Sequence, residues 1–135
     1  MITNFLRKRK DGGPSSPVDA YFLIEIKALF TIAILRFNKG RRESFHTHAF
    51  DACTWFLKGE LLEECVTGTT HMYTRSIKPK VTLKEKNHRV LAMKDSWCLT
   101  IRGPWVEVWT EYEEKENITT IFSWGRKIVC KFKGK

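Results

Sequence analysis

The chain has 135 residues, of which 42% are hydrophobic and 13% aromatic, which is typical of one globular domain and excludes a disordered chain. Its most apolar stretch, residues 21–37, contains Glu25 and Lys27, so no membrane span is expected. Lysine and arginine outnumber aspartate and glutamate by 24 to 15, and the net charge of +9 favours acidic partners such as nucleic acid, nucleotides or other anions.

Residues 1–20 are predicted to form a short, flexible basic arm. Its basic run, residues 7–10, is followed at residues 11–17 by Asp-Gly-Gly-Pro-Ser-Ser-Pro, a composition that interrupts helices and strands. Any turn of helix in the chain is expected here. The arm lacks the apolar segment and cleavage site of a secretory signal, so a cytoplasmic location is expected.

Residues 21–135 are predicted to form one all-β domain. Turn-forming or charged residues separate most of the apolar and β-branched segments, and no helical period extends over a dozen residues. Short strands at this spacing indicate a sandwich or barrel. The expected strands are 21–27, 29–37, 44–50, 52–58, 61–66, 71–77, 80–85, 88–93, 96–102, 105–112, 118–124 and 127–132.

Two of these strands show how side chains are divided between faces. In the strand 105–112, Trp109 shares one face with carboxylates, which fits either the lining of a polar ligand cavity or a half-exposed sheet surface. The strand 96–102 alternates regularly. One of its faces carries Trp97, Leu99 and Ile101, and the other carries Cys98, Thr100 and Arg102.

The four cysteines are widely spaced and include no Cys-x-x-Cys pair. This spacing argues against a four-cysteine metal site and favours free thiols in a reducing compartment. On strands such thiols behave as small hydrophobic residues. They are Cys53, Cys65, Cys98 and Cys130.

The segment His46-Thr-His48 is the main candidate for chemistry. Two histidines at positions i and i+2 of a strand project from the same face, so both imidazoles can reach one metal ion. Iron, manganese, nickel and zinc all accept such a pair when another histidine or a carboxylate completes the set. The alternative is a pair of partly buried, hydrogen-bonded histidines. His71 is expected to be an exposed strand residue.

The stretch from Gly40 to Gly59 resembles the first motif of the cupin superfamily. In that motif a glycine is followed after five residues by His-x-His, and another glycine ends the next strand. The resemblance implies a double-stranded β-helix, or jelly-roll barrel, with His46 and His48 as metal ligands. Ala52 occupies the position of the family's glutamate.

The family's second motif supplies one more histidine, for which His88 is the candidate. Leu83 and Glu85 stand where a Pro-x-Gly turn normally precedes this histidine, and Ala92 stands in place of the usual asparagine. His88 is therefore either a third metal ligand or a hydrogen-bonded core histidine, and the missing turn favours the second interpretation.

A closer resemblance, over residues 21–124, is to small single-domain cupins of bacteria and their phages. The matching segments are the His-x-His stretch that runs to Asp51, a His-Arg-Val element at residues 88–90, and Arg-Gly-Pro at residues 102–104 before a Trp-rich strand that ends at Trp109. These elements specify the fold more closely than the function, because one fold hosts many activities.

Four further residues complete the candidate site. Asp51 is either a metal ligand, a carboxylate that orients a ligating histidine, or a turn aspartate that accepts hydrogen bonds from local backbone amides. Arg89 and Arg102 are candidates to bind an anionic ligand at the mouth of the barrel, although Arg-Gly-Pro also fits a simple strand-ending turn. Trp109 either lines that ligand site or packs in the sheet.

Three functions follow from these features. The favoured one is a cupin that binds a divalent metal (iron, manganese, nickel or zinc) through His46, His48, His88 and Asp51, with an unspecified reaction. The second is a non-catalytic cupin that binds a small, anionic, nucleotide-like molecule. The third is a basic interaction module that contacts nucleic acid or a protein, although no recognition helix or zinc finger supports nucleic acid. The resemblance also implies a homodimer.

Overall fold

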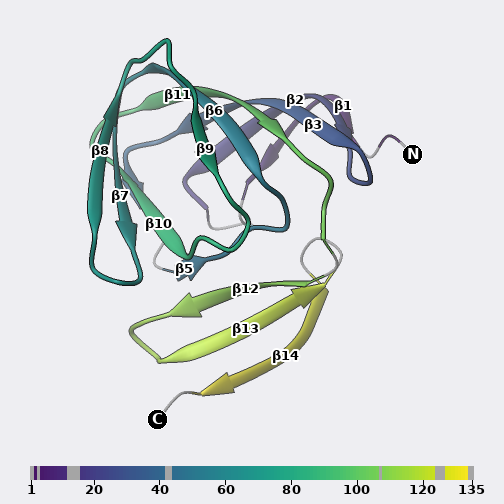
Figure 1. Cartoon of the computed structure of the whole chain (residues 1–135), viewed down its shortest axis with the longest axis vertical. Helices are drawn as coiled ribbons and strands as arrows, with labels where there is room; N and C mark the ends of the chain where they lie inside the picture. Colours follow the sequence, from purple (N-terminus) through teal and green to yellow (C-terminus); the bar gives the residue numbers. More distant parts are fainter. Residues whose placement is uncertain are drawn as a thin grey trace.

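The computed structural model describes residue 2 and residues 4–11, 16–41, 44–106, 108–123 and 127–133 (Figure 1). These residues form fourteen strands and no helix, which confirms the all-β prediction. The described residues also include no helix of the length and hydropathy that a membrane span requires. Two antiparallel sheets enclose the interior of the molecule.

The first sheet has six strands in the order β1-β2-β3-β11-β6-β9. Its central strands agree closely with the segments predicted at 52–58 and 96–102. The strand bounds are β1 Asn4–Lys10, β2 Val18–Ile26, β3 Phe30–Phe37, β6 Ala52–Lys58, β9 Lys80–Thr82 and β11 Ser96–Arg102.

The second sheet has the order β14-β13-β12-β5-β10-β7-β8, and β4 also pairs with β10. In Figure 1, the strands β12, β13 and β14 extend away from the other strands of the sheet, and β12 joins them through its pairing with β5. The strand bounds are β4 Gly40–Arg41, β5 Ser44–His46, β7 Glu60–Cys65, β8 Thr70–Thr74, β10 His88–Ala92, β12 Val108–Glu113, β13 Ile118–Ser123 and β14 Lys127–Lys133.

The N-terminal segment differs from the flexible arm that was predicted. Residues 4–10 form β1, which pairs antiparallel with β2, and the predicted domain boundary after residue 20 falls inside β2. Pairing with β2 satisfies the backbone groups of β1 that face it, and Asn4 Nδ2 donates a hydrogen bond to the buried Glu25 carboxylate at 2.7 Å. Residues 12–15 of the arm lie outside the described residues.

The turn between β6 and β7 requires a glycine. Gly59 has a φ of +106°, and a Cβ atom at this position would collide with the side chain of Ser96. Ser96 is fully buried, and its hydroxyl accepts a hydrogen bond from the Glu60 amide at 2.9 Å. The close approach of β11 therefore explains the glycine that the sequence places after this strand.

The apolar core lies between the sheets in two clusters. The larger contains Ala20, Phe22, Ala33, Leu35 and Leu61, together with three other buried residues. The smaller contains Ala49, Phe50, Trp109 and Phe122. Between them a cavity remains open.

Candidate metal centre

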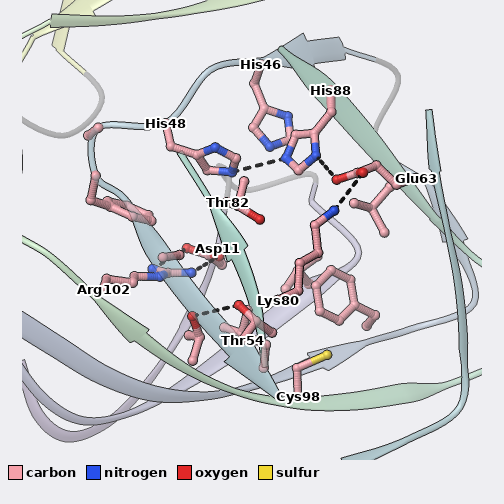
Figure 2. Close-up of a pocket in the computed structure, with 18 of the residues that line it drawn as sticks. Asp11, His46, His48, Thr54, Glu63, Lys80, Thr82, His88, Cys98 and Arg102 are labelled. Atoms are coloured by element: carbon pink, nitrogen blue, oxygen red, sulfur yellow. Dashed lines mark hydrogen bonds and ion pairs between the residues drawn. The ribbon is translucent and has the colours of Figure 1, made fainter. Parts of the chain in front are cut away.

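Three histidines converge at one end of the cavity (Figure 2). His46 ends β5, His88 begins β10, and the two are directly paired in the sheet. His48 follows two residues after His46, and one ring nitrogen from each of the three lies within 4.8 Å of the others. His46 and His88 are buried and His48 is half-buried, so the histidine group lies largely away from solvent.

The chain leaves the sheet between the first two histidines. The strand predicted over residues 44–50 ends at His46, because the Thr47 amide donates to Thr110 O at 3.0 Å and the His48 amide donates to Lys84 O at 2.9 Å. These bonds hold the segment in place without a continuous strand ladder. The His-x-His spacing still brings both imidazoles to the same point, as Figure 2 shows.

His88 is oriented by a carboxylate that the sequence did not reveal. Its Nδ1 lies 2.5 Å from Oε2 of the buried Glu63. A carboxylate only accepts hydrogen bonds, so Nδ1 is the donor to Glu63 and Nε2 is the nitrogen that faces the other two histidines. The Nε2 atoms of His88 and His48 are 3.2 Å apart. Two nitrogens about 2.0–2.1 Å from one tetrahedral ion would be separated by about 3.3 Å, so this pair has the spacing of two ligands of one metal ion, and it is also short enough for a hydrogen bond between the two rings.

Glu63 is itself held by two ammonium groups. Lys80 Nζ and Lys86 Nζ each lie 2.7 Å from Oε1. Burial alone would raise the pKa of Glu63, but the hydrogen bonds from His88 and the two lysines outweigh it and hold this pKa below its ordinary value. The carboxylate that orients His88 is therefore ionised.

Tyr73 closes the same group of side chains. It shares a hydrogen bond with Lys80, and its hydroxyl donates to Glu63 Oε1 at 3.3 Å. Burial and the neighbouring Glu63 charge raise the pKa of Tyr73 to about 12. A phenol with this pKa stays protonated and serves as a hydrogen-bond donor.

Asp51 lies outside the histidine group. Its side chain is exposed, and Oδ1 accepts a hydrogen bond from the Lys84 amide at 2.7 Å. Its carbonyl oxygen accepts another from the Gly103 amide at 2.8 Å. These contacts correspond to the turn aspartate that was one of its interpretations, and they also fix the loop that carries His48.

The residues predicted to bind a ligand fall in different places. Arg102 is 4% exposed, lines the cavity, and donates to both carboxylate oxygens of Asp11 at 3.2 and 2.6 Å. Trp109 also lines the cavity and stacks on Phe122 at 4.6 Å between ring centroids. Arg89 does not line it, because its guanidinium is bound to Glu64 at 3.0 Å.

The cavity has a volume of about 530 Å³ and runs between the sheets from the histidines toward β11. Its far wall is partly polar, since the hydroxyls of Thr54 and Thr100 lie 3.1 Å apart there. Cys98 lies beside them, and burial raises the pKa of its thiol to about 12, so the thiol stays protonated. This volume suits a small organic molecule.

Glu63, Lys80 and Lys86 are the members of the site that sequence reasoning missed. One signal was available. Leu61 and Glu63 are two positions apart on β7, so Glu63 shares the inward face of the strand with a core leucine. The two lysines gave none, because their contacts with Glu63 join residues 17 and 23 positions apart.

No protein-family model matches the chain, and the search of curated proteins gave no match. Solved structures do match. The chain is similar to a protein from Silicibacter pomeroyi that is described as a sugar phosphate isomerase from a cupin superfamily. The TM-score is 0.64, and the identity is 12% over 95% of this chain and 88% of that one.

Two further structures show the same architecture. The EutQ protein of Clostridium difficile aligns with a TM-score of 0.58 and 11% identity over 72% of this chain and 75% of that one. An RmlC-like cupin from Shewanella frigidimarina aligns with a TM-score of 0.56 and 14% identity over 73% and 84%. Identities this low show the fold alone. The two antiparallel sheets and these matches together establish that the chain has the cupin fold.

Proposed function

We propose that the chain binds one divalent transition-metal ion through His46, His48 and His88, and that a small anionic molecule in the cavity completes the coordination. The observation that carries this proposal is the convergence of three imidazoles, one of them fixed by a buried carboxylate. A histidine that donates its second N–H to a carboxylate is the usual arrangement at protein metal sites.

The charges around the site favour an anionic oxygen as the remaining ligand. Three neutral imidazoles leave the full charge on a divalent ion, and Ala52 supplies no carboxylate at the position where cupins carry a glutamate. Lys80 and Lys86 add two positive charges within hydrogen-bond distance of Glu63, which carries one negative charge. An anionic ligand would offset this local excess of positive charge.

An all-imidazole set favours iron, nickel or zinc over manganese. When bound, such an ion supplies Lewis acidity toward an oxygen of the ligand. Glu63 keeps His88 in the tautomer that a metal requires, and the Tyr73 hydroxyl and the two lysines keep Glu63 in position. The partly apolar walls of the cavity would hold the rest of the molecule.

Elemental analysis of the purified protein tests this proposal. We expect about one metal ion per chain in the wild type and less than about one tenth of that in a His46→Ala/His48→Ala variant. The chain offers a matched control: His71 is exposed on β8, so His71→Ala should keep its metal. A metal-free wild type that cannot be reconstituted, or a double variant that retains metal, would contradict the metal site.

A second candidate function is the metal-independent binding of a small anion. It is favoured by Lys27 and Trp105, which both line the cavity, with the ammonium 4.5 Å from the centre of the indole ring. The indole nitrogen of Trp105 is buried and has no hydrogen-bond partner among the described residues. The test is whether phosphate raises the Tm of the metal-stripped protein as much as it raises the Tm of the metal-loaded protein. An equal rise that is lost in Lys27→Ala would support this function over the first.

A further inference from the structure

Two hydrogen-bond donors in the cavity have no acceptor. Arg102 is 4% exposed, and its Nε atom is buried without a hydrogen-bond partner among the described residues. The indole nitrogen of Trp105 is buried in the same way, and both residues line the cavity. Buried N–H groups are nearly always paired in folded proteins, so two such donors in one cavity indicate that an acceptor binds there.

The ring of Phe50 links these donors to the histidines. The guanidinium carbon of Arg102 lies 4.5 Å from the centre of this ring, and the centre of the Trp105 ring lies 5.4 Å from it. The imidazole of His48 contacts the same phenyl ring, with 5.7 Å between centroids. A group bound at Arg102 is therefore one aromatic ring away from the candidate metal centre.

The donors are held in place by the backbone. Arg102 ends β11, where it is paired with Thr31 on one side and Ala52 on the other. The Trp105 amide donates a hydrogen bond to Lys27 O at 2.7 Å, and the Lys27 ammonium lies over the indole ring. A binding group that is ordered beforehand loses little conformational freedom when its ligand arrives.

Asp11 occupies the end of the guanidinium. Its two carboxylate oxygens accept hydrogen bonds from the two terminal nitrogens of Arg102, at 3.2 and 2.6 Å (Figure 2). The Asp11 side chain is 27% exposed, so it reaches the buried guanidinium from the rim of the cavity. The Asp11 amide is bound to Val18 O at 2.9 Å. A turn of the side chain alone would therefore release Arg102, without movement of the backbone.

We propose that Arg102 binds a carboxylate group of the ligand, and that this carboxylate displaces the side chain of Asp11. Exchange of one carboxylate for another keeps the buried guanidinium paired. The ligand can also accept hydrogen bonds from the Nε atom of Arg102 and from the indole of Trp105, which Asp11 leaves unpaired. The inference rests on the proposed function for the other end of the ligand, which is then a small carboxylic acid with an oxygen at the histidines.

The surroundings of Arg102 favour a carboxylate over a phosphate. A guanidinium binds either group through two parallel hydrogen bonds in its own plane. The Phe50 ring lies against the guanidinium, so the space beside that plane is apolar. A planar carboxylate keeps both oxygens in the plane, whereas a tetrahedral phosphate would direct a further charged oxygen toward the ring.

Proton NMR of the Trp105 indole N–H, with acetate as the probe, tests the proposal. Acetate carries the same group as the Asp11 side chain, and Trp105→Phe identifies the signal. We expect a saturable shift of this signal at constant ionic strength. In Asp11→Asn, half-saturation should need at least about ten-fold less acetate, because a neutral amide competes less well for the guanidinium. Arg102→Lys, which lacks the planar fork, should need at least about ten-fold more.

The neighbouring ion pair provides a matched control. Asp19 binds Lys10 at 2.8 Å and does not line the cavity. Asp19→Asn removes the same charge as Asp11→Asn but leaves the Arg102 guanidinium occupied. It should therefore change the half-saturating acetate concentration by less than about two-fold, since only screened charge is altered.

Circular dichroism confirms the fold of each variant, and Asp11→Ser replaces Asp11→Asn if the latter does not fold. Three results would overturn the proposal: equal half-saturation in the wild type and Asp11→Asn, an equal gain in Asp19→Asn, or phosphate that binds Asp11→Asn more tightly than acetate does. The titrations use the purified full chain and are repeated after a chelator has removed metal. A carboxylate site that persists in a protein unable to bind metal would contradict only the metal site, and the reverse result would contradict only this inference.

Discussion

Part of the first sheet reverses the usual distribution of polar and apolar residues, although its inner face also carries the core residues Phe22, Ala33 and Leu35. On β11, the inward Thr100 and Arg102 are 1% and 4% exposed, whereas Ile101 between them points outward and is 40% exposed. This strand thus buries a hydroxyl and a guanidinium, while Ile101 is exposed and Leu99 and Trp97 are half-buried. Alternation along a strand separates two faces, but it does not say which of them is inside.

The inner face tolerates polar groups because they are paired with one another. Thr54 and Thr100 share a hydrogen bond of 3.1 Å, and Arg102 binds both oxygens of Asp11. Such pairing offsets the cost of removing polar atoms from water. The outer face has no such constraint, because its exposed polar atoms can hydrogen-bond to water.

The largest expected effect comes from introducing a lysine on each face of the first sheet in turn. Ala33 is fully buried in the core, so Ala33→Lys should lower the free energy of unfolding by more than about 4 kcal/mol or prevent folding. Ile101→Lys should change it by less than about 1 kcal/mol, since the new ammonium group lies in water. Urea unfolding of the two variants and the wild type measures the difference. Similar losses for the two would show that the outer face is covered within the monomer.

A smaller effect is expected from Glu63, which lies on β7 of the second sheet and binds Lys80, Lys86 and His88 beside the cavity. Glu63→Gln keeps the size of the side chain but removes the charge that Lys80, Lys86 and His88 share, and should cost about 2 kcal/mol at pH 7. Glu85→Gln, on an exposed ion pair, is the control and should cost less than about 0.5 kcal/mol.

The pH dependence of this loss has a defined sign. The folded pKa of Glu63 lies below its ordinary value of 4.5, so its ionisation stabilises the folded state above that pH. As the pH falls below about 4.5, this stabilisation decreases, and the unfolding free energies of the wild type and Glu63→Gln should converge. A constant difference from pH 7 to pH 3 would mean that Glu63 acts through packing alone.

Much of the fold could be predicted from the chain because local patterns determined it. The segments at 52–58, 96–102 and 118–124 coincide closely with β6, β11 and β13. The strand β1 was missed because its basic residues suggested a solvated arm, whereas its structure depends on pairing with β2, a partner that its own residues do not reveal.

The candidate site was predicted where a local pattern or the resemblance to cupins specified its residues, and it was missed elsewhere. The spacing of His46 and His48 is a local signal, and the resemblance to cupins added His88. Glu63 could not be assigned to His88 from spacing, because β7 and β10 meet only through the sheet register. Asp51 was included in the predicted metal site because it is close to His48 in the sequence. In the structure, the turn after His48 directs the Asp51 side chain to the Lys84 amide.

The smallest expected effect concerns the hydroxyl pair on the far wall of the cavity. Thr54→Val leaves the buried Thr100 hydroxyl without its partner and should cost about 1–2 kcal/mol in urea unfolding. Thr54→Val/Thr100→Val removes both hydroxyls with little change of shape and should cost less than the single variant. Additive losses would instead mean that each hydroxyl stabilises the fold independently. If the double variant is as stable as the wild type, folding does not require a polar inner face. The threonines would then be explained by what the cavity binds, and the reversal of the two faces would be a consequence of function.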